Sequence, residues 1–342
     1  MSANPILAEQ TRGTLVENRH RGAFVVCDAD GRVIAAAGDI ERPVFPRSAI
    51  KSIQALALFT SGADMQFDLS NEELALACAS HHGEEVHVAG VTGFLGHIGV
   101  APTALECGAH QPNNPAARAG LRAAGENPSA LHNNCSGKHS GMLAVARALG
   151  APTEHYVERD HPVQVEVRRV IETVIGGPLS EDRCGTDGCS IPTWAAPLGA
   201  FARGFARMAT GAGLPEEIAN ASRRLFDAAT SHPQLVAGTG HVDTRVMAAF
   251  GGRVMQKGGA EGVQCGAIRD KGWGYALKCD DGNMNASIAM VAELLLALAG
   301  PDEAQRKVLG EFAVQDIRNV RRILVGEMRG TDELRSALRG QL

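Results

Sequence analysis

Apolar residues gather in short runs near both ends of the chain, and helical spacing fills the region between. Each short run is bounded by glycine, proline or charged residues, as is typical of strands. The first two runs flank Asp28-Ala29-Asp30-Gly31, a sequence that favours a hairpin turn. Strands are therefore predicted at residues 14–28, 32–38, 251–255, 263–268 and 274–278.

Apolar residues at helical spacing predict one long helix from Ser48 and another at about 284–298, after Asp281-Gly282-Asn283. Further helices are predicted from residue 71 to 230. Prolines and glycines make residues 99–134 irregular, and the charged tail from Pro301 is predicted to be helical.

This order of elements predicts an α/β (α+β) fold in which an antiparallel sheet is flanked by helices and carries a large helical insertion. We expect a single domain over residues 1–342. Its sheet layer would come from about 14–62 and 235–300, and the insertion from about 63–234.

The composition narrows the possible partners. Hydrophobic residues make up 44% and charged residues 21%, which is ordinary for a soluble globular protein. The net charge is −5 without a basic block, so we expect no nucleic-acid partner. The longest apolar run, Ala286–Ala299, carries Glu293 and is too short to span a membrane. The N-terminus lacks the features of a signal peptide, which indicates a cytoplasmic protein.

Ser48 and Lys51 are three residues apart in the first predicted helix, so their side chains are neighbours. A desolvated lysine near a helix N-terminus can take the serine proton and activate the hydroxyl as a nucleophile. The alternative is an N-cap serine followed by a surface lysine. Arginine supplies 27 of the 33 basic residues, so the few lysines indicate a need for a removable proton.

Two further stretches offer similar chemistry. Ser80 and His81 follow a predicted helix, where Ser80 can relay a proton and His81 can bind a substrate. Lys257 lies beside two glycines that would let a substrate approach the backbone closely. The alternatives are a capping serine with ordinary loop histidines, and an exposed turn lysine.

A polar helix entrance contains Cys135, Lys138 and His139, and a turn-rich loop contains Asp187, Gly188 and Cys189. Two thiols and a neutral amine can bind a soft ion such as zinc, although a lysine ligand is rare because it must first lose its proton. The alternative is two buried thiols and a capping aspartate.

Several stretches together resemble the rhizobial-type (class 3) L-asparaginases, whose fold is similar to that of serine β-lactamases and one glutaminase family. They lie in the same order between about residues 13 and 285, and the segment after about residue 300 matches poorly. The matching stretches are RSAIKSIQALAL, CASHHGE, NNCSGKHSGMLA, GTDGCSIPT with the following APL, HPQLVAGTG and KGGAEGV.

The resemblance implies a role for each matching residue. The catalytic pairs would be Ser48 with Lys51 and Ser80 with Lys257, and which serine attacks stays open. A zinc ion and a homodimer are also implied. The zinc ligands would be Cys135, Lys138 and Cys189, and the substrate-binding residues would be Arg47, His81, His139, Asp187 and Gly188.

We therefore expect an amidohydrolase that converts L-asparagine to L-aspartate and ammonia. A glutaminase is an alternative because its substrate differs by one methylene, which a pocket distinguishes by only about 1–3 kcal/mol. A serine hydrolase that acts on β-lactams is another. The non-enzymatic alternative is a zinc-dependent protein that binds an amino acid without turning it over.

Overall fold

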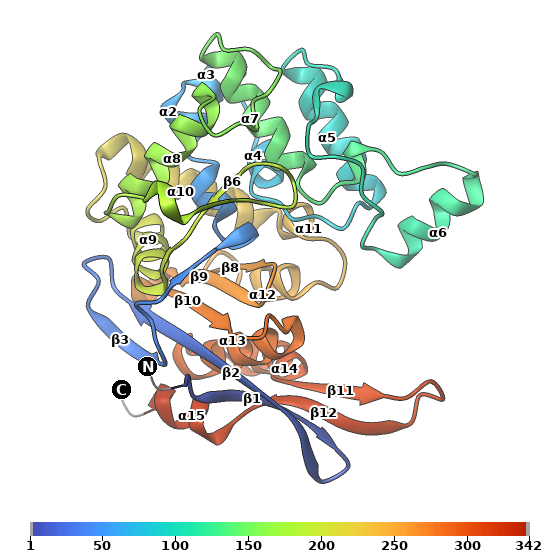
Figure 1. Cartoon of the computed structure of the whole chain (residues 1–342), viewed down its shortest axis with the longest axis vertical. Helices are drawn as coiled ribbons and strands as arrows, with labels where there is room; N and C mark the ends of the chain where they lie inside the picture. Colours follow the sequence, from blue (N-terminus) through green and yellow to red (C-terminus); the bar gives the residue numbers. More distant parts are fainter. Residues whose placement is uncertain (1–2, 340–342) are drawn as a thin grey trace. The chain divides into compact units, whose positions relative to one another are not determined.

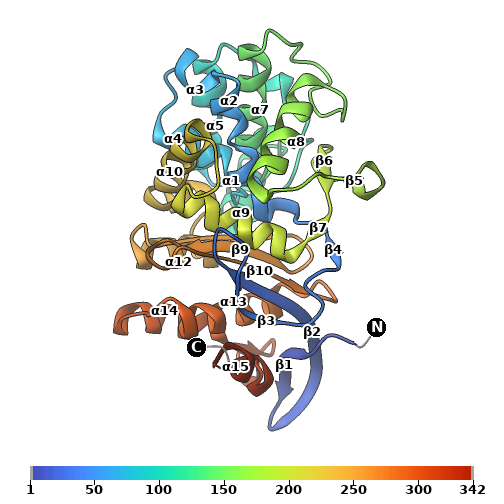
Figure 2. The same ribbon diagram turned by 90° about the vertical axis from the view of Figure 1, so that its left-hand side faces the viewer.

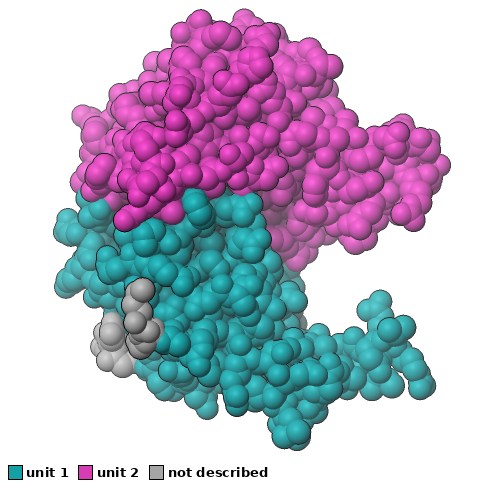
Figure 3. All heavy atoms as spheres, viewed as in Figure 1, with its two compact units in different colours: residues 1–50, 196–210, 245–342 teal, residues 51–195, 211–244 magenta. Residues whose placement is uncertain are grey.

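The computed structural model describes residues 3–339 and contains two compact units, which Figure 3 colours separately. Unit 1 comprises residues 1–50, 196–210 and 245–342. Unit 2 comprises residues 51–195 and 211–244. Each unit therefore combines segments that are far apart in the sequence.

An eight-stranded antiparallel sheet is the framework of unit 1 (Figure 1). The strand order is β11-β12-β1-β2-β10-β9-β8, and β3 pairs separately with β2. A short ladder joins β4 (Pro43–Val44) to β7 (Ala196–Pro197). The strands of the large sheet are β1 Ile6–Arg12, β2 Leu15–Cys27, β3 Val33–Ala37, β8 Val254–Gly259, β9 Val263–Ile268, β10 Trp273–Cys279, β11 Val314–Arg318 and β12 Leu324–Gly330.

Helices cover both faces of this sheet (Figure 2). On one face, α9 (Leu198–Thr210) packs closely against β10 at Gly274. Any larger residue there would clash, since a Cβ would lie 1.9 Å from the Ala202 carbonyl oxygen. On the other face lie α13 (Met284–Leu298), α14 (Glu303–Ala313) and α15 (Asp332–Arg339). The 3₁₀ turn η5 (Arg269–Lys271) joins β9 to β10.

Strand alternation places Lys257 on the sheet face opposite α13. Its neighbour Gln256 donates to Gln264 (2.7 Å), which in turn donates to Ser287 of α13 (3.0 Å). Successive side chains of a strand point to opposite faces, so Lys257 and Gly259 share the other face. There the turn η1 (Arg47–Ile50) packs so closely that a Cβ on Gly259 would lie 2.7 Å from the Pro46 carbonyl oxygen.

Unit 2 is mainly helical, and α7 runs through its core with residues 136–146 all buried. Helices α2, α3, α4, α5 and α8 pack around α7. The helices of this unit are α1 Lys51–Gln54, α2 Ala57–Thr60, α3 Ala63–Gln66, α4 Asn71–Ala77, α5 Glu85–His97, α6 Pro115–Ala124, α7 Ser136–Ala148, α8 Pro162–Ile175, α10 Glu216–Ser231 and α11 Pro233–Val236.

Short elements complete the chain. Strands β5 and β6 form a hairpin in unit 2, and α12 spans the point at which the chain passes from unit 2 to unit 1. Their bounds, with those of the remaining 3₁₀ turns, are β5 Cys184–Thr186, β6 Pro192–Trp194, α12 Val242–Phe250, η2 Pro102–Ala104, η3 Ala130–His132 and η4 Glu181–Arg183.

The expected antiparallel sheet, its flanking helices and the large helical insertion are confirmed. The prediction for the tail is partly wrong, because residues 314–318 and 324–330 form strands β11 and β12. β11 is the edge strand and β12 pairs with both β11 and β1, and neither strand has the continuous apolar run by which other strands were predicted. Strand β1 was not predicted at all.

Two other predictions need correction. The long helix expected from Ser48 is instead three short pieces, η1, α1 and α2. Residues 99–134 are not irregular throughout, because Asn114 caps α6 with its side chain and Pro115 occupies the first helical position. No helix among residues 3–339 is long and apolar enough to cross a membrane.

Candidate active site

Two thiols and two amines meet at the start of α7, and we name Lys51, Cys135, Lys138 and Cys189 the amine–thiol cluster. Lys138 Nζ lies 3.0 Å from Cys189 Sγ, and Lys51 Nζ lies 3.2 Å from Cys135 Sγ. All four residues are at most 5% exposed. Because Cys135 is the N-cap of α7 and Lys138 lies in its first turn, one helix end holds half of the cluster.

Cys189 reaches the cluster from the β5–β6 hairpin. The Asp187 backbone donates to the Ile191 carbonyl (2.8 Å), and the Ser190 backbone donates to the Asp187 carbonyl (2.9 Å). Ser190 adopts a positive φ of 76°, which a residue with a side chain rarely does. This turn buries Cys189 while its neighbours Gly188 and Ser190 stay exposed.

Glycines on α7 bring the Ser80 segment close to the cluster. A Cβ on Gly137 would lie only 2.3 Å from the Leu76 carbonyl oxygen, so only glycine lets α7 approach α4 this closely. After α4, the His81 backbone donates to Asn134, and His81 Nε2 lies 2.8 Å from Ser136 Oγ. Lys51 donates to the carbonyl of Ala79, directly before Ser80.

Burial and the neighbouring charges set the protonation of these groups. Burial lowers the pKa of Lys51, which favours a neutral amine. The hydrogen bond between the two thiols lowers the pKa of Cys189 to about 5, and Lys138 contributes to the fall. The same hydrogen bond, with burial, raises the pKa of Cys135 to about 12. The cluster therefore holds one thiolate and one thiol.

Lys138 differs from Lys51. Burial alone would lower the pKa of Lys138, but Cys135 and Cys189 together outweigh burial and raise the pKa above its ordinary value. Lys138 is therefore the charged amine beside the thiolate, and Lys51 is the amine that more easily gives up its proton.

His139, which is buried on α7, adds an imidazole to the core of unit 2. Its Nδ1 lies 2.6 Å from the Tyr156 hydroxyl, which accepts a hydrogen bond from the Glu106 backbone. Its Nε2 is buried and has no partner among the described residues. Burial lowers the pKa of His139 to about 3, so the ring is neutral. A buried ring nitrogen without a partner is available to a bound molecule.

Unit 1 carries the other predicted catalytic groups. Ser48 is half-buried in η1 and follows Arg47, whose φ of +50° is strained for an arginine. Lys257 is 3% exposed on β8, and its amine donates to the Gly258 carbonyl at 2.7 Å. Because η1 packs on β8, Ser48 and Lys257 belong to neighbouring elements of one unit.

The structure thus groups the predicted residues by unit. Lys51, Ser80, His81, His139, Asp187 and Gly188 belong to unit 2 with the three predicted zinc ligands, and Arg47, Ser48 and Lys257 belong to unit 1. The sequence analysis missed three supporting residues, Asn133, Ser136 and Tyr156. Asn133 accepts a hydrogen bond from the Cys135 backbone at 2.8 Å. Only the polarity of the stretch before α7 hinted at Asn133 and Ser136, and nothing in the sequence indicated Tyr156.

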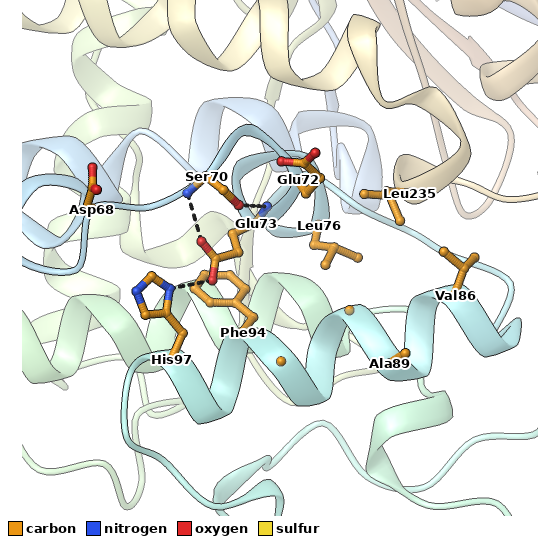
Figure 4. A pocket seen from close by; sticks show the side chains of 12 residues that line it. Asp68, Ser70, Glu72, Glu73, Leu76, Val86, Ala89, Phe94, His97 and Leu235 are labelled. Carbon is orange, nitrogen blue, oxygen red and sulfur yellow. Dashed lines mark hydrogen bonds and ion pairs between the residues drawn. The ribbon is translucent and has the colours of Figure 1, made fainter.

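One groove in unit 2 lies away from these residues, between α4 and α5 (Figure 4). It measures about 570 Å³, and its lining includes Leu76, Phe94 and Leu235 but none of the predicted site residues. The polar groups at its end hold α4 in place, since Glu73 accepts hydrogen bonds from the Ser70 backbone and from His97. The groove is therefore not the predicted active site.

Comparison with known families decides what kind of protein this is. The profile of the L-asparaginase II family matches residues 8–330. The chain belongs to this family. The match includes strands β11 and β12, so the family extends into the tail after about residue 300, where the sequence resemblance is poor. Membership of the L-asparaginase II family makes the chain an amidohydrolase.

Solved structures give weaker similarities. The native form of the protein Mglu shares 16% identity, with a TM-score of 0.46 over 92% of this chain and 73% of that one. In its high-salt form the identity is 15% and the TM-score 0.45, over 87% of this chain and 66% of that one. A β-lactamase from Mycobacterium bovis shares 13% identity, with a TM-score of 0.39 over 77% of this chain and 88% of that one. A comparison with curated proteins finds no match.

Proposed function

We propose that this member of the L-asparaginase II family hydrolyses the side-chain amide of L-asparagine to L-aspartate and ammonia. One observation carries the proposal: the buried amine of Lys51 lies against the segment that leads into Ser80, beside two thiols and a second amine. Lys51 also follows Ser48 by three residues, so an amine that readily loses its proton is near both candidate serines in the sequence or the structure, and acyl transfer needs such a base.

In the proposed reaction, the oxygen of Ser48 attacks the amide carbon while its proton passes to the neutral Lys51 amine. Backbone amides hold the oxyanion, among them that of Ser48 and one on β8. The C–N bond then breaks, and the leaving nitrogen takes a proton through Ser80 and departs as ammonia. Water hydrolyses the acyl-enzyme and releases aspartate. The assignment of Ser48 as nucleophile, and the pairing of Ser80 with Lys257, stay predictions from the resemblance.

Substrate binding is proposed for Arg47, His81, His139, Asp187 and Gly188. His139 has the clearest structural support, because its Nε2 is buried without a partner among residues 3–339. In His81, both ring nitrogens already have partners, the Ser136 hydroxyl and the Gly83 backbone, and burial holds its pKa well below the ordinary value. We therefore propose that His81 orients the Ser80 segment and that His139 contacts the substrate.

Zinc is proposed as the cofactor, held by Cys135, Lys138 and Cys189. The donor set fits, because two sulfurs joined by a hydrogen bond and an amine 3.0 Å from one of them are ligands that zinc accepts. Binding would require Cys135 and Lys138 to release their protons. When bound, the ion would supply a fixed positive charge that orients the amino-acid head group.

Ammonia release from asparagine, glutamine and a β-lactam tests the function. We expect turnover of asparagine, and loss of it in Ser48→Ala and Ser80→Ala. Ser52→Ala is the matched control, because its hydroxyl is buried without a partner among the described residues and its removal leaves the site intact. Circular dichroism would confirm that all variants fold.

Three results would contradict the proposal. Full activity in both serine variants would exclude the serine mechanism. Faster turnover of glutamine or of the β-lactam would change the substrate class. Binding of asparagine without ammonia release would favour the non-enzymatic alternative.

A homodimer and a cytoplasmic location complete the proposal. Both come from the sequence analysis, the first from the family resemblance and the second from the N-terminal composition. Light scattering of the purified chain and fractionation of the source cells would test them.

A further inference from the structure

A second group of metal-ligand side chains lies in unit 1, and we name His20, Cys279 and Asp281 the carboxylate–thiol cluster. One ring nitrogen of His20, the Cys279 sulfur and one carboxylate oxygen of Asp281 all lie within 4.8 Å of one another. His20 Nδ1 is 2.7 Å from Asp281 Oδ2, and Cys279 Sγ donates to Asp281 Oδ1 at 3.0 Å. His20 and Cys279 are buried, and Asp281 is half exposed.

Three elements of unit 1 converge at this cluster. His20 lies on β2 opposite Ala8 of β1, and Cys279 ends β10 opposite Gly22 of β2. The chain then turns, and Asp281 accepts a hydrogen bond from the backbone of Asn283, the N-cap of α13. The cluster therefore joins the middle of the sheet to the start of its longest covering helix.

The contact with Asp281 fixes which His20 nitrogen can take part. Nδ1 faces the Asp281 carboxylate at 2.7 Å, so Nε2 lies on the far side of the ring from that carboxylate. His20 is 5% exposed, and its Nε2 has no hydrogen-bond partner among the described residues. Nδ1 is therefore the nitrogen that can share a cation with Cys279 and Asp281.

The donor types indicate which ligand fits. Imidazole nitrogen, thiolate sulfur and carboxylate oxygen together favour zinc or a similar borderline divalent cation over magnesium or calcium, which prefer oxygen alone. Ligand atoms around a tetrahedral zinc ion lie about 3.5 Å apart, so these side chains would need to separate by less than about 1 Å.

Water would complete the four-coordinate shell of a zinc ion here. The β8–β9 turn packs beside the cluster, since a Cβ on Gly262 would lie 2.9 Å from the Cys279 Cβ. Glu261 of this turn is exposed and lies against Gly282, where a Cβ would be 2.7 Å from its carboxylate oxygen. It is not among the ligand atoms that lie within 4.8 Å of one another.

We propose that His20, Cys279 and Asp281 form a zinc site in unit 1, separate from the amine–thiol cluster of unit 2. The two sites share no residue. An ion here would join β2, β10 and the start of α13, so its expected effect is on stability rather than on the chemistry of amide hydrolysis.

Cobalt is the probe, because a cobalt–thiolate bond absorbs light that zinc does not. The full chain, stripped of metal, is titrated with Co²⁺ as wild type, Cys279→Ser, Asp281→Asn and Cys189→Ser. Cys27→Ser is the matched control, because Cys27, like Cys279, is buried at the end of a sheet strand. Cys27 lies in β2 and outside the cluster. We expect Cys279→Ser to remove about one cobalt per chain with its thiolate band, Asp281→Asn to weaken that site at least tenfold, and Cys27→Ser to change nothing.

Cys189→Ser separates the two sites, because it should leave the Cys279-dependent cobalt in place even if the proposed amidase chemistry fails. Zinc should also raise the melting temperature of wild type but not of Cys279→Ser. Asp281 is half exposed, so Asp281→Asn tests the site even if Cys279→Ser does not fold. Equal cobalt binding by Cys279→Ser, Asp281→Asn and the Cys27→Ser control would overturn the proposal.

Discussion

The two thiol clusters show how neighbouring groups decide what a buried cysteine can do. In the amine–thiol cluster of unit 2, Cys189 has a thiol and the Lys138 amine beside it, and its pKa falls to about 5. In the carboxylate–thiol cluster of unit 1, burial and the hydrogen bond to Asp281 raise the pKa of Cys279 to about 12. Both residues are at most 3% exposed, so exposure does not explain the difference.

The comparison separates two uses of the same side chain. An amine partner stabilises the thiolate and keeps negative charge in a buried site, where it can position a substrate or a metal ion. A carboxylate partner keeps the thiol protonated until a cation displaces the proton. The amine–thiol cluster is therefore suited to holding a buried negative charge, and the carboxylate–thiol cluster to joining structural elements.

The largest effect should come from removing an amine. Lys51→Met should lower kcat for asparagine about 1000-fold, or about 4 kcal/mol, because the proposed base is lost while a side chain of similar length still fills the core. Lys278→Met is the matched control. Lys278 also lies beside a thiol residue, since it donates to the Cys279 carbonyl, but in unit 1. Steady-state kinetics of both variants would measure the contrast.

Equal losses in the two lysine variants would remove the distinction between the clusters. A normal kcat in Lys51→Met would remove Lys51 from the mechanism. An unchanged urea midpoint would show that the loss of activity is not a loss of folding.

The next effect concerns the packing that positions the amine–thiol cluster. Gly137→Ala places a Cβ 2.3 Å from the Leu76 carbonyl, so α7 must move away from α4. We expect a loss of about 3 kcal/mol in unfolding free energy. Gly120→Ala in α6 is the control, since nothing lies within 4 Å of its Cβ and it should gain up to about 1 kcal/mol. Urea unfolding measures both, and similar values would show that the close approach is not required.

The contrast between these glycines also shows what the sequence could and could not reveal. Spacing predicted helices between residues 71 and 230, and α8 and α9 are among them because their apolar positions recur every three or four residues. The same pattern cannot show that Gly137 faces a backbone carbonyl and Gly120 faces solvent. That difference depends on α4, which is 60 residues away in the chain.

The sequence also predicted only part of the candidate active site. Motifs indicated Cys135, Lys138 and Cys189 as neighbours, and the structure brings them together. The sequence predicted a desolvated Lys51 but did not indicate that Lys51 contacts Cys135. It also did not indicate that His20 meets Cys279 and Asp281. These contacts depend on the register of β2 and β10 and on how α1 meets α7. Neither is encoded in local spacing.

A smaller effect should appear with pH. Burial lowers the pKa of His81, His82 and His87 below 6.5, to about 4 for His82. The unfolded chain takes up protons below about pH 6.5 while the folded chain does not, so stability is full above that pH and falls as the pH drops toward 4. Urea midpoints at about pH 7 and about pH 5 would measure the fall. His82→Gln should reduce this fall. Equal urea midpoints at the two pH values would contradict the prediction, because they would show that the folded chain takes up as many protons as the unfolded chain between them.

The smallest effect returns to unit 1 without metal. Asp281→Asn should cost only about 1 kcal/mol of unfolding free energy, because its remaining oxygen can still accept from the Asn283 backbone and from Cys279. Asp281→Ala should cost about 2 kcal/mol more, because it leaves the buried His20 and Cys279 without their shared acceptor. Urea unfolding in chelator would measure the difference. If both variants cost the same, the carboxylate does not organise the cluster, and the contrast between the two thiols would rest on the neighbours of Cys189 in unit 2 alone.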